Sequence, residues 1–461
     1  MFEFFFQPNG VAILGASKNT LKGGFHIVKN VVAGYKGKIY PVNPNYDEIL
    51  DLPCYPDVES IPDNFDLVIY FIPSRHLPET ILACAKKGVK GIIIESGGFT
   101  EAGEEGERIQ KQALENAKKC GIRLWGPNCM GFMDAHTWHV FSFLHSLIWP
   151  DVFKPGNVGL IVQSGMLSAG FLLAALEDGV MGVSKTCSIG NKCDINENDI
   201  LEFFIQDDKT DVIACYLESL IDGRRFAELA RSTSKPIIVL MGGRSKEGSR
   251  AAMSHTASLS GNYGVTHGAF KQAGILEVFE PSELTDTARA FSKITSYRPG
   301  KGTAIMTFSG GAGTITTDLF EDYAISLAKL SEQTLSEVGA LFPSWIKPTH
   351  PLDLWVAIEQ RGYKEVYLKT IKALMTDPAV DSIILQTYAT PEIGDEFFVE
   401  VAGLMRKYEK TVILWVEGRK QLVEHMRNIA EQAGIPAYRD LARTVSVLAG
   451  LKRHFHKKMY R

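Results

Sequence analysis

The segment from Gly242 to Gly261 places one histidine, His255, among glycine, serine and alanine residues directly after the apolar run 236–241. Small residues let a backbone move and approach a ligand closely. The segment also holds groups that suit phosphate binding, namely the hydroxyls of Ser254, Thr256, Ser258 and Ser260 and the guanidinium groups of Arg244 and Arg250. We therefore expect a long loop, in which His255 could be a nucleophile that carries phosphate between two places. A lone loop histidine is more often a surface residue or an ordinary base, so the other features of the chain must decide.

One plan of elements occurs three times along the chain. An apolar strand runs into a Gly/Ser turn at 11–17, at 158–165 and at 304–311. Short apolar segments that alternate with amphipathic helices follow each turn. We expect these segments to be strands: 38–44, 67–73, 91–98 and 122–128; 183–191, 212–219, 236–243 and 275–280; 325–331, 382–388, 412–418 and 436–440. This pattern predicts an α/β protein of three consecutive doubly wound parallel-sheet domains, with seams near 132–157 and 283–302.

Polar residues follow the strands of the second predicted domain. Ser164 and Gly165, Asn191, and Glu218 each come directly after a strand, and the next strand leads to His255. Because ligands bind at the carboxyl ends of parallel strands, we expect these groups to meet at one edge. Strand ends are often polar simply because they leave the core. That alternative explains each residue singly, but not an acid placed where it could orient a histidine.

The first domain carries a glycine-rich turn, 15–24, in which a helix N-terminus and Lys22 could bind a phosphate. A solvated surface lysine is an equally good interpretation of Lys22. The second strand ends in 42–45 without the acid that usually binds the NAD ribose. This pattern disfavours a dehydrogenase and is compatible with coenzyme A. The chain has no Walker-type phosphate loop, so we expect no ATP site of its own.

Composition excludes several classes of protein. The 461 residues carry a net charge of −4 and have no basic excess for nucleic acid or an anionic membrane. The seven scattered cysteines suggest reduced thiols rather than disulfides or a metal site. The apolar start, 1–6, lacks the basic leader of a signal peptide, and no apolar run approaches 18 residues. We expect a cytoplasmic protein of two to four domains without a membrane span.

Taken together, the motifs resemble those of the NDP-forming acyl-CoA synthetases, relatives of succinyl-CoA synthetase, and most of all the α subunits of ADP-forming acetyl-CoA synthetases. The motifs that carry the resemblance are 15–24, 40–44, 95–103, 126–131, 163–168, 190–203, 216–219 and 254–261. The resemblance implies a CoA-binding Rossmann-like domain at 1–131 and an inter-domain segment at 132–157. A succinyl-CoA-ligase-like domain with the phosphohistidine segment follows at 158–290, and a third, flavodoxin-like ligase domain at 300–461.

The resemblance also implies residue roles. His255 is the residue that is phosphorylated, and Glu218 orients or polarises it. Two helix N-termini hold the phosphate without a metal, through Ser164 and Gly165 and through Gly310, Gly311 and Gly313. The implied CoA-binding residues are Gly15, Ser17, Lys22, Asn43, Pro44, Pro73 and Asn128. Candidate substrate-pocket residues are Asn128, Asn191 and Asp194.

The implied function is the α subunit of an ADP-forming acyl-CoA synthetase. Such an enzyme couples a thioester reversibly to ADP and ATP through an acyl phosphate and a swinging phosphohistidine. The resemblance implies a separate ATP-grasp β subunit, in an α2β2 assembly, that binds ATP or ADP with Mg. A small carboxylic acid is the other substrate. Two alternatives stay open, a non-catalytic scaffold that binds CoA or a nucleotide and an NAD-dependent oxidoreductase.

Four features depart from the family pattern, one of them being Ala257 and Ser258 after the His-Thr pair, where Gly and Ala are common. The chain has Met241-Gly242 where Lys-Ala is common and His350 where Asn is usual, and its segment 132–149 is rich in aromatic residues and histidine. The departures bear on the choice of acid more than on the chemistry, so an acetate specificity does not follow from the resemblance.

Overall fold

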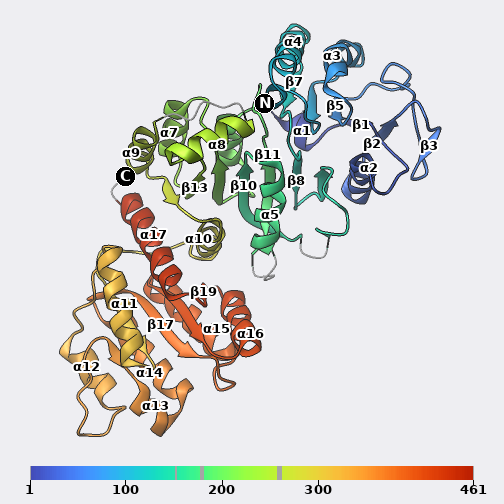
Figure 1. The fold of residues 1–461 in the computed structure, drawn as a ribbon. Coiled ribbons are helices and arrows are strands. Elements are labelled where there is room, and N and C mark those ends of the chain that lie inside the picture. The colour runs from blue at the N-terminus through green and yellow to red at the C-terminus, as the bar shows by residue number, and fades with distance from the viewer. Residues whose placement is uncertain (1, 151–152, 177–180, 257–261, 460–461) are drawn as a thin grey trace. The chain divides into compact units, whose positions relative to one another are not determined.

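The computed structural model describes residues 2–150, 153–176, 181–256 and 262–459. Its contacts divide the chain into two compact units, and the boundary falls between Thr285 and Asp286. The first unit holds two β-sheets and the second unit holds one, as the colours of Figure 1 help to follow. The predicted α/β class with parallel sheets is confirmed.

The first sheet has five parallel strands in the order β2-β1-β5-β6-β7. Its central strands are completely buried, as expected where helices cover both faces. The strands are β1 (Gly10–Leu14), β2 (Lys38–Val42), β5 (Leu67–Tyr70), β6 (Gly91–Ile94) and β7 (Arg123–Trp125), and β3 (Glu48–Ile49) and β4 (Leu52–Pro53) form a separate antiparallel pair. The helices are α1 (Glu3–Phe6), α2 (Gly23–Gly34), α3 (Leu77–Lys86) and α4 (Glu104–Cys120), with 3-10 turns η1 (Ser74–His76) and η2 (Thr100–Ala102).

The second sheet has seven strands in the order β14-β13-β12-β10-β11-β8-β9. Five are parallel, and the segment 132–141 adds two antiparallel strands at one edge. The strands are β8 (Phe132–Asp134), β9 (His139–Phe141), β10 (Pro155–Val162), β11 (Val183–Ser188), β12 (Val212–Leu217), β13 (Ile237–Met241) and β14 (Leu276–Val278). The helices are α5 (Gly165–Leu176), α6 (Glu197–Gln206), α7 (Gly223–Ser232), α8 (Lys246–Thr256), α9 (Tyr263–Ala273) and α10 (Pro281–Lys293).

The third sheet has five parallel strands in the order β16-β15-β17-β18-β19. These strands are β15 (Gly302–Thr307), β16 (Leu352–Asp353), β17 (Val380–Tyr388), β18 (Thr411–Glu417) and β19 (Ala437–Tyr438). The helices are α11 (Gly310–Asp322), α12 (Glu332–Gly339), α13 (Trp355–Arg361), α14 (Tyr363–Thr376), α15 (Asp395–Tyr408), α16 (Lys420–Gln432) and α17 (Leu441–Met459).

The predicted strand at 325–331 is wrong. Only a single bridge, between Leu327 and Thr303, forms there, and β16 lies beside β15 instead. The physical reason is His350, whose Nε2 accepts the N–H of Ile305 at 2.9 Å while its Nδ1 donates to the carbonyl of Ala328 at 2.8 Å. The neutral imidazole of His350 therefore replaces further backbone hydrogen bonds between 325–331 and β15. Burial lowers the pKa of His350, which favours this neutral form.

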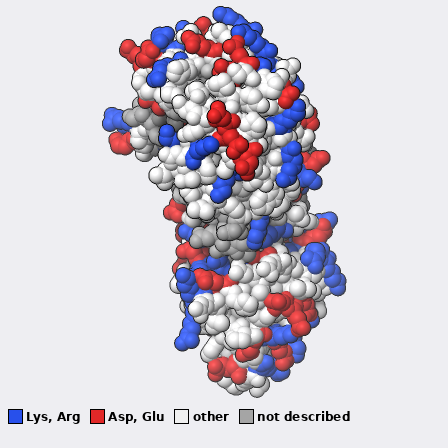
Figure 2. Space-filling model, turned by 90° about the vertical axis from the view of Figure 1, so that its right-hand side faces the viewer, with Lys and Arg blue, Asp and Glu red and all other residues white. Residues whose placement is uncertain are grey.

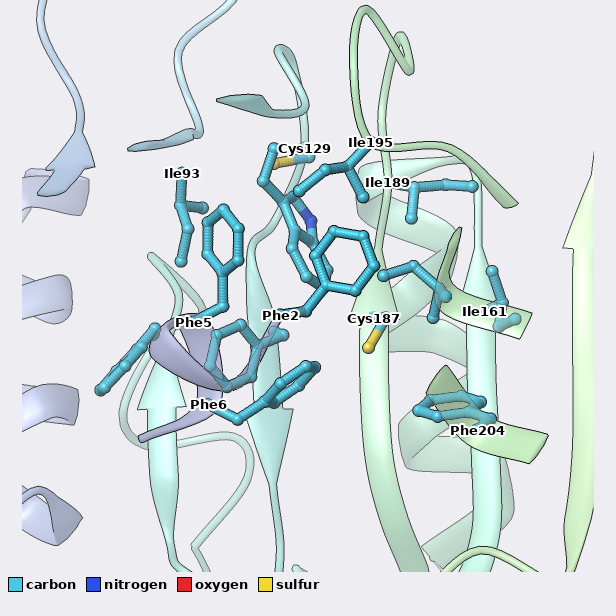
Figure 3. Packing of buried hydrophobic residues seen from close by; sticks show 14 of the residues in the cluster. Phe2, Phe5, Phe6, Ile93, Cys129, Ile161, Cys187, Ile189, Ile195 and Phe204 are labelled. Carbon is cyan, nitrogen blue, oxygen red and sulfur yellow. The ribbon is translucent and has the colours of Figure 1, made fainter. Parts of the chain in front are cut away.

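Aromatic side chains of the N-terminal segment join the two sheets of the first unit. Phe5 and Phe6 of α1 are buried, and Phe6 stacks on Phe203 of α6 with ring centroids 4.3 Å apart. Phe6 also contacts Phe132 of β8 at 4.7 Å, and Phe5 meets Trp125 of β7 at 5.4 Å. Figure 3 shows this cluster, which continues to the labelled side chains Phe2, Ile93, Cys129, Ile161, Cys187, Ile189, Ile195 and Phe204.

Charged side chains do not separate by sign on the face that Figure 2 shows, where lysine and arginine are interspersed with aspartate and glutamate. No helix in the described part of the chain is both long and apolar enough to cross a lipid bilayer. All seven cysteines are free thiols.

A Phe6→Ala substitution should lower the free energy of unfolding of the first unit by about 3–5 kcal/mol, because it removes a buried ring from between two sheets. Urea unfolding measures this loss. Phe4→Ala, at a half-buried position of the same helix, is the matched control and should cost clearly less. A Phe6→Ala protein that unfolds at the same urea concentration as the wild type would contradict the joining role.

Candidate active site

The carboxyl edge of the second sheet holds Glu218 in a fixed place. Gln163 follows β10, and its Oε1 accepts hydrogen bonds from the backbone N–H groups of Glu218 at 2.8 Å and Ser219 at 3.2 Å. Glu218 follows β12, and its side chain is buried at 6% exposure. The residue after β10 therefore fixes the backbone that follows β12. The Glu218 carboxylate lies at the strand end where the sequence predicts it.

A buried ion pair supports the same turn from the segment that follows β11. Lys192 donates to the carbonyl and hydroxyl oxygens of Ser219 at 2.8 and 3.1 Å, and its Nζ lies 3.0 Å from Glu197 Oε2. Both charged side chains are fully buried. Burial lowers the pKa of Lys192, and the charge of Glu197 offsets part of this effect. Because either charge alone would be costly in this environment, the pair fixes the turn at Ser219.

The prediction of a long loop around His255 is wrong for 246–256, which form helix α8. The reason is a cap that the sequence interpretation missed: Ser245 Oγ accepts the backbone N–H of Gly248 at 3.0 Å, and Glu247 lies in the first turn. The backbone of His255 lies in the last turn of α8. Its side chain, like those of Ser254 and Thr256, and all of Ser258 and Ser260, lies outside the described residues.

Helix α8 packs against η2, the 3-10 turn that follows β6 of the first sheet. Next to η2 the structure brings together Asn128 and Asn191, whose amides meet at 3.5 Å, and Asn191 Nδ2 donates to Glu101 Oε2 at 2.6 Å. Asp194 is not part of this cluster, because its carboxylate pairs with Arg123 Nε at 2.8 Å. Two of the three candidate substrate-pocket residues therefore lie together near the helix that carries the histidine.

Helix α5 begins beside the motif 126–131. A Cβ added to Gly165 would lie 3.4 Å from Met130 Cγ and 4.0 Å from the carbonyl carbon of Cys129. Ser164 precedes α5, and its carbonyl accepts from Ser168 N at 3.1 Å and Oγ at 2.9 Å. Cys129 is buried, which raises the pKa of its thiol and agrees with its interpretation as a small core residue. The first phosphate-binding candidates thus lie against the Asn128 turn.

The other phosphate-binding candidates lie in the second unit, where α11 begins. Gly310 and Gly311 open the helix after Ser309, and a Cβ at Gly310 would lie 3.2 Å from Asp353 Oδ2. Gly313 lies against Pro351, 3.1 Å from a Cβ at that position. The close approach of β16 explains why small residues occupy this first turn.

Three of the predicted CoA-binding residues line one pocket. Gly15, Asn43 and Pro44 border a cavity of about 450 Å³ at the carboxyl edge of the first sheet. Gly15 has φ +87°, and a Cβ there would lie 2.3 Å from the carbonyl oxygen of Phe71, so only glycine fits. Asn43 Nδ2 donates to the carbonyl of Ala16 at 2.8 Å, which ties the two motifs together.

The remaining CoA-binding candidates do not line that cavity. Ser17 is buried and accepts the N–H of Asn19 at 3.0 Å. Lys22 is the exposed residue before α2, and the carbonyl of Pro73 accepts from the Tyr70 hydroxyl at 2.7 Å. Among the described residues, no group of His, Cys, Asp and Glu side chains is arranged to hold a metal ion.

Glu95, at the end of β6, is a buried acid to which the sequence interpretation gave no role. It is 4% exposed, and a Cβ at Gly131 would lie 2.7 Å from its Oε1. Burial raises the pKa of Glu95 well above its usual value, and the backbone N–H of Phe143 offsets only part of this effect. Burial therefore favours the protonated, neutral form of this side chain. The sequence did contain a signal for this buried acid: Glu95 directly follows the apolar strand β6, whose four residues are all buried.

Replacing Glu95 with glutamine should make stability less dependent on pH. Because the pKa of Glu95 is raised on folding, the folded protein keeps a proton that the unfolded chain releases above the ordinary glutamate range. The free energy of unfolding of the wild type should then fall relative to Glu95→Gln by up to about 1.4 kcal/mol per pH unit as the pH rises. Thermal unfolding from pH 4 to pH 8 measures this, with the exposed Glu115→Gln as control. A constant difference across that range would contradict the buried neutral acid.

Comparisons with known proteins agree with this geometry. Residues 9–135 match the family described as CoA binding domain, and residues 155–291 match the one described as succinyl-CoA ligase like flavodoxin domain. The chain is 36% identical over 446 residues to acetate–CoA ligase [ADP-forming] II subunit alpha of Pyrococcus furiosus, covering 95% of this chain and 94% of that one. It is 37% identical to acetate–CoA ligase [ADP-forming] II of Archaeoglobus fulgidus over 98% of this chain but 67% of that longer protein.

A solved structure shows the same fold. The chain superposes with a TM-score of 0.88 and 31% identity on dinucleotide forming acetyl-coenzyme A synthetase 1 of Ca. Korarchaeum cryptofilum, determined in complex with phosphate and ADP. The match covers 100% of this chain and 98% of that one. With its sheets, motifs and near full-length matches, the chain belongs to the family of NDP-forming acyl-CoA synthetases, as an α-type chain of an ADP-forming acid–CoA ligase.

Proposed function

We propose that this chain forms an acyl phosphate from a thioester and phosphate and that His255 then takes the phosphoryl group to a partner subunit. A phosphate oxygen attacks the thioester carbonyl, the C–S bond breaks, and CoA leaves as the thiol. An imidazole nitrogen of His255 next attacks the phosphorus, and the P–O bond to the carboxylate breaks. The products are the free acid and a phosphohistidine, so atoms and charge balance without an oxidant or reductant.

The observation that carries this proposal is the placement of Glu218. It is a buried carboxylate held by Gln163 at the end of β12, and the neighbouring strand β13 leads directly into α8, whose last turn contains His255. A nucleophilic imidazole needs one nitrogen held as the proper tautomer and needs a negative charge to stabilise the imidazolium. Glu218 supplies both in this proposal.

The N-terminus of α5 and the cavity beside Gly15 support a location for phosphate and for CoA in this proposal. The N-terminus of α5 lies against the Asn128 turn, and backbone N–H groups at a helix N-terminus favour phosphate. The cavity beside Gly15 and Asn43 is of a size and polarity that suits part of a CoA molecule. We propose that the N-terminus of α11, which begins at Gly310, is a second phosphate-binding element.

The partner in this proposal is an ATP-grasp β subunit that binds ADP or ATP with Mg, in an α2β2 assembly. The name subunit alpha of the Pyrococcus furiosus relative supports a second subunit, and the length of the Archaeoglobus fulgidus relative supports a fused one. The acid is a small carboxylic acid. Relatives are named for acetate and, at 30% identity over 97% of this chain, for 4-hydroxybutyrate, so both belong in a substrate screen.

The chain should acquire acid-labile label on His255 when it is incubated with radiolabelled phosphate and an acyl-CoA from a panel of short, hydroxylated, branched and aryl thioesters. His255→Asn should abolish the label, whereas His425→Asn, at an exposed position of the second unit, should label like the wild type. Glu218→Gln should label about 100-fold more slowly, because the imidazole loses its charge partner. Absence of label with every thioester, or equal label on His255→Asn, would overturn the proposal and favour a non-catalytic scaffold.

The isolated chain should make no ATP from acyl-CoA, phosphate and ADP, because it carries no Walker-type phosphate loop and the second transfer needs the partner subunit. Label should stop at one phosphoryl group per chain, and addition of the ATP-grasp subunit should start ATP formation. A luciferase assay follows ATP directly. Sustained ATP formation by the isolated chain would contradict the separate partner.

A further inference from the structure

A tyrosine hydroxyl contacts the Glu218 carboxylate directly. Tyr216 lies two residues before Glu218, so the two side chains emerge on the same face because strand side chains alternate. The Tyr216 hydroxyl donates to Glu218 Oε1 at 3.2 Å. Gln163 and Lys192 hold the backbone of this turn, whereas Tyr216 acts on the carboxylate group itself.

The sheet holds the backbone of Tyr216, and one neighbouring ring packs on its side chain. Tyr216 pairs with Val162 of β10 and with Leu240 of β13 in the middle of the sheet. The ring of Phe171, on α5, packs against the tyrosine ring with centroids 5.7 Å apart. Burial and the nearby Glu218 charge raise the pKa of Tyr216, so the hydroxyl keeps its proton and remains a donor over the working range of pH.

A glycine leaves the space that this pair needs. A Cβ added to Gly242, at the end of β13, would lie 2.9 Å from the Tyr216 hydroxyl oxygen and 3.3 Å from Glu218 Cγ. Gly242 has no left-handed φ, so its backbone alone does not require glycine. A methyl group at this position would instead crowd the Tyr216 hydroxyl and the Glu218 side chain.

We propose that Tyr216 is a positioning residue for phosphoryl transfer: its hydroxyl holds the Glu218 carboxylate in one orientation toward His255, and Gly242 leaves the space for this contact. The proposal rests on the proposed function. A carboxylate that turns freely about its last bond would present its lone pairs to the imidazole only part of the time. A donor fixed by the sheet and by α5 removes that freedom.

Other side chains in the described part of the chain also face the Glu218 turn. Lys192 and Glu197 approach it from the segment after β11 and form a fully buried pair, and the Glu218 charge also acts on Lys192. Gln163, from β10, and Phe171, from α5, are uncharged, and Gly242 brings no side chain from β13. Among these groups, Tyr216 is the one whose removal changes the donor set of the carboxylate without removing a charge.

Tyr216→Phe should label His255 about tenfold more slowly than the wild type, as expected when a carboxylate loses a hydrogen bond. The KM for the thioester should stay unchanged. Tyr40→Phe is the matched control, since it removes a hydroxyl that donates to a carboxylate, Asp63 Oδ2, at 2.7 Å on the first sheet. It should keep the wild-type rate.

Gly242→Ala gives a second, independent test. The added methyl group should displace the hydroxyl or the carboxylate and slow labelling, and it should slow labelling less when Tyr216→Phe has already removed the crowding oxygen. A Tyr216→Phe chain that labels at the wild-type rate, or one whose loss lies only in the KM for the thioester, would overturn the positioning role. If Tyr216→Phe unfolds at a lower temperature, the comparison of Gly242→Ala in the wild type and in Tyr216→Phe still tests the role. Equal slowing of labelling by Gly242→Ala in both chains would overturn the positioning role. A wild-type chain without label would instead overturn the proposed function.

Discussion

The amide oxygen of Gln163 accepts two consecutive backbone N–H groups, those of Glu218 and Ser219, and the rest of the candidate site depends on this contact. Parallel strands end at a common edge, but the chain leaves each strand in its own direction. The Gln163 side-chain amide accepts the two backbone N–H groups that follow β12, and so continues the pairing of β10 and β12 beyond the ends of the strands. Helix α5 can then begin at Gly165, two residues after Gln163, while Glu218 stays buried at the end of β12.

The second constraint is the common core of the first unit. The rings of Phe5 and Phe6 join the first sheet, with its cavity beside Gly15, to the second sheet, which carries Glu218. Two sheets that share one core cannot shift independently, because close-packed interiors transmit displacement. The relative placement of the residues proposed to bind CoA and of Glu218 is therefore set by packing within one unit.

Much of this organisation could be predicted from the sequence. Three strand–turn–helix repeats, the α/β class and the polar residues at the strand ends follow from apolar periodicity and from turn residues. The failures have local physical causes. Ser245 caps α8, so a glycine- and serine-rich stretch that reads as a loop begins as a helix. The ring of His350 takes a backbone N–H that a neighbouring strand would otherwise have taken. Tyr216 and Gly242 gain their importance from a contact between neighbouring strands, which no spacing in a single sequence discloses.

The central claim is that one phosphoryl group is carried by His255 beside Glu218. Mass spectrometry of the chain, quenched under alkaline conditions after reaction with an acyl-CoA and phosphate, tests it most directly. We predict a single phosphoryl group on the peptide that contains His255 and none in the His255→Asn variant. A phosphoryl group on any other residue, or turnover of the thioester without a phosphorylated chain, would contradict the account.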